Sequence, residues 1–124
     1  MSNNRRVVVT GLGAVTPIGN NVQETWNSMI SGKNGIGPIT KFDTSNYKAK
    51  LAAEVKDFDP RDYMDKMESL RTDRYTQLAI AASAQAVEDS GIEGTVEPER
   101  FSVALGVGIG GMETFEVEHT KLIE

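Results

Sequence analysis

The chain has 124 residues, 39% hydrophobic and 25% charged, with a net charge of −5, no cysteine and one histidine. This size and composition are ordinary for one soluble domain with a modest core. The acidic balance argues against nucleic-acid binding, which needs clustered Lys and Arg, and the lack of cysteine excludes disulfides and thiolate metal sites. No apolar run reaches the roughly 20 residues of a membrane helix, so we expect a cytoplasmic protein without membrane contact.

The chain begins with a pattern that predicts a buried strand followed by a helix. Residues 7–9 are Val-Val-Val, a β-branched run that suits a strand covered on both faces. Residues 11–20 have the glycines and proline of a loop. Asn21 is a good N-cap because Glu24, three residues on, can return a bond to the N–H of the cap, and Gly32 is expected to end the helix. The apolar positions of this helix are Val22, Trp26, Met29 and Ile30.

The middle of the chain contains weaker signals. Residues 33–47 hold four structure breakers and are expected to be an irregular connection. Residues 51–55 could form a short strand. Residues 57–62 are predicted to be a loop that leads into a single helical turn near Tyr63 and Met64.

The strongest predicted helix spans residues 72–90 and stops at Gly91. Its alanines should let another backbone approach closely. Residues 101–107 are a second buried-strand candidate, and residues 112–124 return to helical spacing. The resulting order is an α/β pattern with connections long enough for parallel strand pairing. The stripe of the long helix consists of Tyr75, Leu78, Ala79, Ala82, Ala86 and Val87.

Gly106, Gly108 and Gly111 satisfy the G-x-G-x-x-G pattern after a predicted strand and before a predicted helix. That context lets a helix N-terminus meet the pyrophosphate of a dinucleotide. The acidic ribose-binding residue, expected about 20 residues later, would fall beyond Glu124. A tight turn is the competing interpretation, and a small nucleotide-binding α/β module stays open as an alternative.

Two other groups of polar residues could carry chemistry. His119 falls on the apolar side of the last helix, which favours a buried structural role, although Glu116 gives it the i,i+3 spacing of carboxylate-bridged metal sites. No partner helices are evident for such a site, and we expect neither a metal nor a cofactor. Lys66, Arg71 and Arg74 form the one local basic cluster, which is either a solvated face or a docking patch for an acidic carrier protein or a phosphate.

Six segments in order resemble one family across nearly the whole chain. The sequence is similar to the elongating β-ketoacyl-acyl carrier protein synthases of bacterial type II fatty-acid synthesis. Each segment alone is unspecific, but six in the correct order and spacing are strong evidence. The segments are residues 5–19 (RRVVVTGLGAVTPIG), 42–44 (FDT), 56–58 (KDF), 72–77 (TDRYTQ), 87–91 (VEDSG) and 108–111 (GIGG).

The resemblance implies an α/β fold, namely a partial N-terminal half of a thiolase-like layered αβαβα fold. Residues 1–124 would be an incomplete N-terminal part of the ketoacyl synthase N-terminal domain, in a parent that is a homodimer. The implied reaction is acyl transfer onto a cysteine, then decarboxylative Claisen condensation with malonyl-carrier protein. Acyl carrier protein and acyl and malonyl thioesters are the implied partners, with no nucleic acid.

The resemblance also places the catalytic groups of the family outside this sequence. The cysteine, both histidines and a supporting lysine would lie beyond Glu124, so we expect the chain alone to be inactive. The alternative within the resemblance is a ketosynthase-like partner that lacks the nucleophile and acts by dimerisation.

Two implied features fall inside the chain. The isoleucine of Gly-Ile-Gly-Gly gates the acyl-chain pocket in the family, which points to Gly108 and Ile109 as substrate-binding residues; the competing interpretation is that Ile109 caps a core strand.

The second implied feature is the surface that meets the carrier protein. It would include Lys66, Arg71 and Arg74. Met67 and Leu70 occupy positions where the family usually has basic residues, and Arg71 alone agrees with the pattern.

Overall fold

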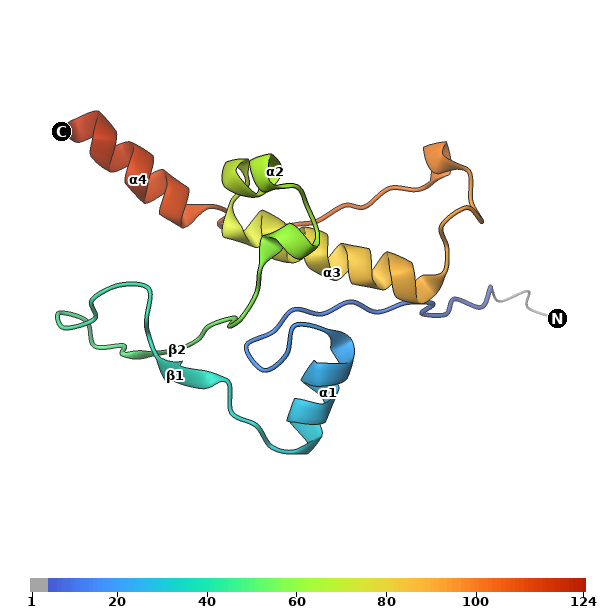
Figure 1. The fold of residues 1–124 in the computed structure, drawn as a ribbon, viewed down its shortest axis with the longest axis horizontal. Helices are drawn as coiled ribbons and strands as arrows, with labels where there is room; N and C mark the ends of the chain where they lie inside the picture. The colour runs from blue at the N-terminus through green and yellow to red at the C-terminus, as the bar shows by residue number, and fades with distance from the viewer. Residues whose placement is uncertain (1–4) are drawn as a thin grey trace.

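The computed structural model describes residues 5–124 and is built around one long helix, with an N-terminal segment and a small sheet on one side of it (Figure 1). Within these residues, no helix combines the length and apolar character needed to cross a bilayer. The elements in chain order are α1 (Val22–Ile30), β1 (Ile36–Pro38), β2 (Leu51–Ala53), η1 (Pro60–Asp62), α2 (Lys66–Arg71), α3 (Arg74–Ser90), η2 (Pro98–Arg100) and α4 (Met112–Ile123).

Helix α1 begins at the predicted cap. The Asn21 side chain accepts a hydrogen bond from the Glu24 N–H at 2.8 Å. The Glu24 carboxylate accepts its bond from the N–H of Asn20 at 2.9 Å, so our prediction that it would bond the cap residue itself is wrong by one position. The helix ends at Ile30 with Ser31 as its C-cap, and Gly32 follows with a φ of 70°, as the sequence indicated.

The sheet differs from the prediction in direction and in extent. Strand β1 pairs antiparallel with β2, with Gly37 opposite Ala52. The predicted strand 51–55 is confirmed for its first three residues. Strand β1 lies in the stretch that we expected to be irregular, because Pro38 and Gly37 are breakers by composition yet are accepted in a short edge strand that ends at the proline. The parallel pairing expected from the element order is not found in residues 5–124.

Two short helices precede the long one. In η1, the N–H groups of Tyr63 and Met64 donate to the carbonyl of Pro60, which gives the single turn that was predicted, slightly earlier in the chain. Helix α2 was not predicted. Its start is nevertheless marked in the sequence, because Asp65 accepts a bond from the Glu68 N–H at 2.9 Å in the manner of an N-cap.

Helix α3 starts two residues later than predicted because Asp73 has extended backbone angles and serves as its N-cap. Gly91 ends it in the left-handed conformation, with a φ of 59°, as expected. The buried positions of the described chain both lie on this helix, at Ala81, which is fully buried, and Gln77, which is 9% exposed.

The N-terminal segment crosses α3 at the distance of a backbone contact. A Cβ atom added to Gly11 would lie 2.6 Å from the Ser90 nitrogen, and one added to Gly13 would lie 2.9 Å from the Ala86 nitrogen. Since real Cβ atoms essentially never come that close, both positions require glycine. The predicted close approach to the alanine-rich helix is confirmed.

Side-chain hydrogen bonds from α3 fix the same crossing. The Leu12 N–H donates to the Asp89 carboxylate at 2.9 Å, and the Ala14 N–H donates to the Gln85 amide oxygen at 3.1 Å. The backbone of the N-terminal segment is therefore satisfied by helix side chains where a strand would be satisfied by a neighbouring strand.

The two predicted buried strands are not formed. Residues 7–9 and 101–107 lie outside every helix and strand, and Val7 is 92% exposed. A strand exists only beside a hydrogen-bonded neighbour, and the described residues supply none to either segment.

The described chain leaves much apolar surface uncovered. Its accessible surface is 10334 Å². A compact monomer of 13.5 kDa would expose about 6,500 Å². Exposed apolar side chains occur in both unpaired segments and along the whole of α4, so the apolar faces of these elements are not covered by other parts of residues 5–124.

Candidate functional site

The Gly108–Gly111 loop joins the extended segment 101–107 to α4. Gly110 has a φ of 81°, which glycine adopts without strain, and Gly111 is the N-cap of α4. Ile109 is 79% exposed at the tip of this loop. Its side chain therefore has room to move, with a glycine on each side of it.

The start of α3 lies against the end of this loop. The Thr114 hydroxyl donates to the Asp73 carboxylate, and a Cβ atom on Gly111 would collide with that same carboxylate. A Cβ on Gly110 would lie 3.8 Å from the Tyr75 ring. Sequence reasoning missed Asp73 and Thr114, since the sole signal was an acidic residue at a helix start, which normally bonds its own helix.

This arrangement opposes the nucleotide-binding interpretation. The carboxylate of Asp73 lies beside Gly111 at the N-terminus of α4. A pyrophosphate placed there would meet a negative charge, which opposes its binding.

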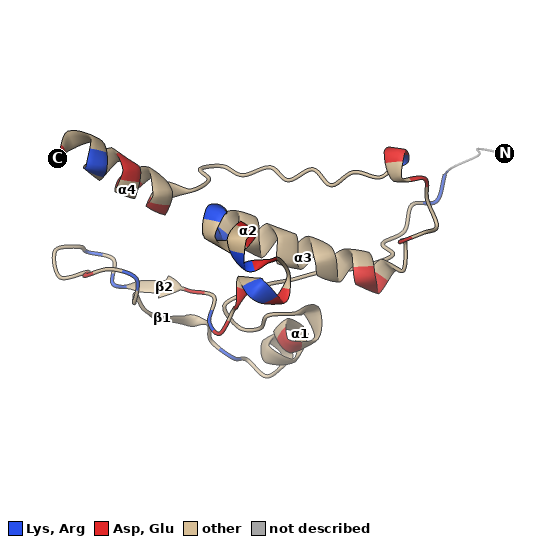
Figure 2. Cartoon of the chain, turned by 45° about the horizontal axis from the view of Figure 1, so that its top comes forward, with Lys and Arg blue, Asp and Glu red and all other residues tan. Residues whose placement is uncertain are grey.

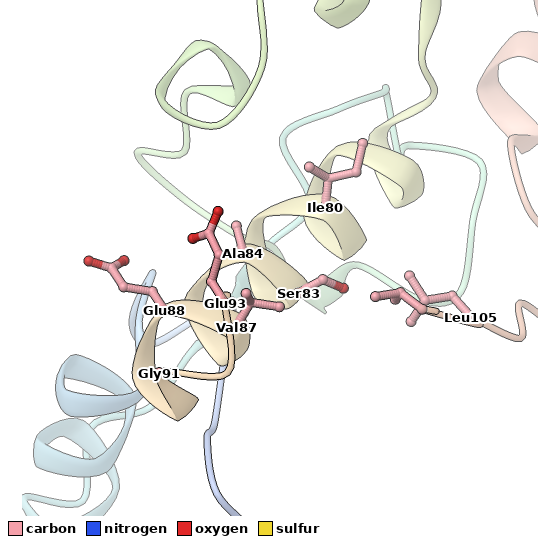
Figure 3. Close-up of a pocket in the computed structure, with 9 residues that line it drawn as sticks. Ile80, Ser83, Ala84, Val87, Glu88, Gly91, Glu93 and Leu105 are labelled. Atoms are coloured by element: carbon pink, nitrogen blue, oxygen red, sulfur yellow. The ribbon is translucent and has the colours of Figure 1, made fainter. Parts of the chain in front are cut away.

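An open apolar groove of about 680 Å³ runs between α3 and the extended segment (Figure 3). Its shape and apolar lining suit an aliphatic chain or another apolar segment. Ile109 is not among its lining residues, so the predicted role of Ile109 in an acyl pocket stays a prediction. The groove is lined by Ile80, Ser83, Ala84, Val87, Glu88 and Gly91 of α3 and its end, and by Glu93, Val103 and Leu105.

The predicted basic patch does not converge on one point. Lys66 and Arg71 are both exposed and are the first and last residues of α2. Figure 2 shows Lys and Arg distributed over several parts of the chain. Five helical positions separate them, which turns their side chains about 140° apart. The guanidinium of Arg74 lies 4.6 Å from the centre of the Phe58 ring and is held there, while its Nη1 donates to the Phe58 carbonyl at 3.5 Å.

The turn at η1 contains an ion pair between Asp59 and Arg61. Asp59 accepts hydrogen bonds from the Arg61 side chain and from its N–H, and these bonds lower the pKa of Asp59 from 3.8 to about 2. The same carboxylate raises the pKa of Arg61. The turn also brings Tyr63 under Phe58, with ring centres 6.0 Å apart and nearly parallel.

Gln85 joins three parts of the chain, and sequence reasoning missed it. Its amide nitrogen donates to the Asn20 carbonyl at 2.8 Å and to the Tyr63 hydroxyl at 3.0 Å. The Asn20 amide in turn donates to the carbonyls of Lys56 and Asp57, both at 3.0 Å. The available signal was a polar residue within an alanine-rich helix face.

The expectation that His119 is buried is wrong. All residues of α4 are exposed, and the His119 ring stacks on Phe115 with centres 5.8 Å apart. The apolar side of α4 has no covering element in residues 5–124. Nowhere in this described part of the chain do three His, Cys, Asp or Glu side chains gather in a way that could hold a metal ion, the surroundings of Glu116 included.

Comparison with known proteins gives consistent sequence matches. Residues 4–123 match the family described as the β-ketoacyl synthase N-terminal domain. The 3-oxoacyl-[acyl-carrier-protein] synthase 2 of Staphylococcus aureus is 48% identical over 125 residues, which cover 100% of this chain and 30% of that protein. The protein of the same name from Synechocystis is 44% identical over 121 residues, or 97% of this chain and 29% of that protein. The chain thus spans less than a third of the length of these relatives.

Two solved structures match the fold. One is the ishigamide ketosynthase/chain length factor, with a TM-score of 0.78 and 30% identity, covering 96% of this chain and 30% of that chain. The other is the ketosynthase of a type II polyketide synthase, in complex with its acyl-carrier protein, with a TM-score of 0.69 and 24% identity over 93% of this chain and 31% of that chain. These matches confirm the predicted α/β fold class.

Proposed function

The chain belongs to the β-ketoacyl synthase family, and we propose that it forms the N-terminal part of an elongating 3-oxoacyl-acyl-carrier-protein synthase. The observation that carries this proposal is the 48% identity to 3-oxoacyl-[acyl-carrier-protein] synthase 2 along the whole chain. The likeness covers 30% of that relative, so the activity belongs to a longer protein that contains these residues.

The proposed reaction joins two acyl groups through a cysteine. A cysteine thiolate attacks the acyl thioester and forms a new thioester, while the old carbon–sulfur bond breaks and the carrier thiolate leaves and takes up a proton. A thiolate suits both roles because it is nucleophilic near neutral pH and leaves readily. Malonyl-carrier protein then loses carbon dioxide, and the resulting enolate attacks the acyl carbonyl. The new carbon–carbon bond forms as the cysteine thiolate leaves. Imidazole and backbone N–H donors would stabilise the enolate and the oxyanion.

These groups must come from outside the present sequence. It has no cysteine and a single histidine, and that histidine lies on exposed α4. We therefore expect the 124-residue chain to be inactive by itself and the longer protein to supply the nucleophile.

Within the chain, Ile109 is the residue that we assign to the acyl-chain pocket, with Gly108 beside it. The side chain is apolar and exposed at the loop tip, so it can pack against an alkyl chain. The glycines on either side lower the barrier to moving it.

Carrier-protein docking is assigned to the α2 surface, with Arg71 as its main contact. Arg71 is exposed at the end of the helix, Lys66 is exposed at the beginning, and Arg74 is held against Phe58. Basic side chains of this kind would pair with an acidic carrier protein. We further propose that the longer protein is a cytoplasmic homodimer.

The reaction is tested with the purified longer protein, an acyl-carrier protein substrate and malonyl-carrier protein. We expect a 3-oxoacyl product together with released carbon dioxide, and we expect thiol alkylation to abolish both. Absence of condensation, or condensation that survives complete alkylation, would overturn the proposal.

The pocket role of Ile109 is tested by substitution. In the longer protein, Ile109→Phe should lower kcat/KM for long acyl chains roughly tenfold more than for short ones, because the larger ring removes pocket volume. Ile36→Phe, the same change at an exposed isoleucine of β1, is the control and should leave the chain-length profile unchanged. An equal loss at every chain length would mean that Ile109 is structural.

A further inference from the structure

Asp73 occupies the N-cap of α3 but does not cap it with its side chain. Its carbonyl accepts the first helical bond, from the Gln77 N–H at 3.0 Å, whereas its carboxylate makes no bond to the N–H groups of its own helix. Aspartate at this position ordinarily bonds the N–H two or three residues on. The carboxylate is therefore directed to a different partner.

That partner is the first turn of α4, 41 residues away in sequence. Thr114 donates its hydroxyl to the Asp73 carboxylate. The carboxylate also lies against Gly111, the N-cap of α4, at a distance that leaves no space for a side chain there. A negative charge at a helix N-terminus is favoured by the helix dipole, so Asp73 stabilises the start of α4 as well as touching it.

Together with the approach of Tyr75 to Gly110, this contact restrains a part of the chain that is otherwise exposed in residues 5–124. From Met112 onward each residue of α4 is exposed, and Ile109 is 79% exposed. Gly110 and Gly111 follow Ile109 and permit many backbone conformations. A fixed first turn of α4 therefore limits where the loop, and with it Ile109, can lie.

We propose that Asp73 is a positioning residue for the acyl-chain pocket: through Thr114 and Gly111 it joins the start of α3 to the start of α4 and so sets the position of Ile109. The inference rests on the proposed role of Ile109. It adds a specificity-determining pair, Asp73 and Thr114, that lies outside the glycine loop itself.

The test uses four variants of the longer protein. Asp73→Ala removes the carboxylate, and Thr114→Val removes the hydroxyl donor at nearly constant shape. Asp73→Asn keeps an oxygen acceptor for Thr114 and should rescue. Glu113→Ala is the matched control, because it removes an exposed carboxylate from the same turn of α4.

Two quantities are measured for each variant. One is amide hydrogen exchange at Met112 and Phe115, whose N–H groups donate to the carbonyls of Gly110 and Gly111, and it reports opening of the loop and of the first turn of α4 without reference to activity. The other is the ratio of kcat/KM for long and short acyl chains. We expect Asp73→Ala and Thr114→Val to speed the exchange roughly tenfold and to change the ratio about threefold or more. Asp73→Asn and Glu113→Ala should remain close to the wild type in both.

Each alternative outcome has a distinct meaning. Unchanged exchange in Asp73→Ala would overturn the proposal, and so would an equal loss of activity at all chain lengths. Faster exchange with an unchanged ratio would also overturn it, provided that Ile109→Phe does change the ratio. If Ile109→Phe leaves the ratio unchanged, the proposed pocket role of Ile109 fails, and the exchange data alone then decide whether Asp73 positions the loop.

Discussion

The N-terminal crossing and the C-terminal arm of this chain are held in place in different ways. The crossing, residues 11–14 on α3, is fixed by two glycines in backbone contact and by side-chain bonds from Gln85 and Asp89. The C-terminal arm, residues 101–124, is exposed throughout except at Gly110 and Gly111, where Tyr75 and Asp73 approach.

The two regions differ in whether the described residues supply all of their stabilising contacts. The crossing has its donors, acceptors and close contacts among the described residues. The C-terminal arm contains Ile109, which we assign to the acyl-chain pocket. The apolar side chains of α4 and of the unpaired extended segment are exposed in this arm. We infer that residues 101–124 must pack against the rest of the longer protein in order to function.

The largest expected effect comes from breaking the crossing. Gly13→Ala would place a methyl group against the backbone of α3, so we expect it to lower the free energy of unfolding by about 3 kcal/mol. The measurement is urea unfolding of the longer protein.

Gly37→Ala, at a glycine of β1, is the matched control. Nothing in the described chain lies within 4 Å of the added Cβ atom, so this variant should unfold close to the wild type. If both variants lost the same stability, the claim that the crossing is fixed by backbone contact with α3 would be incorrect.

A smaller effect is expected from the ion pair between Asp59 and Arg61 at η1. The folded-state pKa of Asp59 is about 2, below its ordinary value of 3.8. The contribution of this carboxylate to stability is therefore complete above pH 3.8 and is lost as the pH falls towards 2. Asp59→Asn should be slightly less stable than the wild type near neutral pH, and the difference should shrink in that acidic window.

The pH effect is checked by urea unfolding of both proteins at a series of pH values. Asp62→Asn, which removes an exposed carboxylate from the same turn and keeps the Asp59–Arg61 ion pair, serves as the control for the loss of one negative charge. A constant difference between Asp59→Asn and the wild type across the acidic window would contradict the assignment.

Helix boundaries were predicted well because their information is local. Asn21 with Glu24, and Gly91 after the alanine-rich helix, are signals within a few residues of the structure that they define. The short helix α2 had such a signal at Asp65 as well, and it was missed because the stretch is short.

Strands could not be predicted in the same way because pairing is not local. Residues 7–9 and 101–107 have strand composition, yet no neighbour among the described residues pairs with them. Strand β1 has breaker composition, yet β2 pairs with it. In both cases the partner, not the segment, decided the outcome.

The residues of the candidate site also differ in whether a local sequence signal identifies them. Ile109 was found through the family resemblance of its glycine motif. Asp73 was not found, since its partner Thr114 is 41 residues away and an N-cap aspartate is expected to bond its own helix. Likewise, the contact of Arg74 with Phe58, which holds it out of the basic patch, follows from packing between segments.

The most direct test of the account is hydrogen exchange at the amides of residues 7–9 and 101–107 in the longer protein. If the chain is the first part of a ketoacyl synthase, these segments become paired strands, and their amides should be protected as strongly as those of α3. Rapid exchange in both segments, at the rate of exposed chain, would contradict the claim that the rest of the protein covers them.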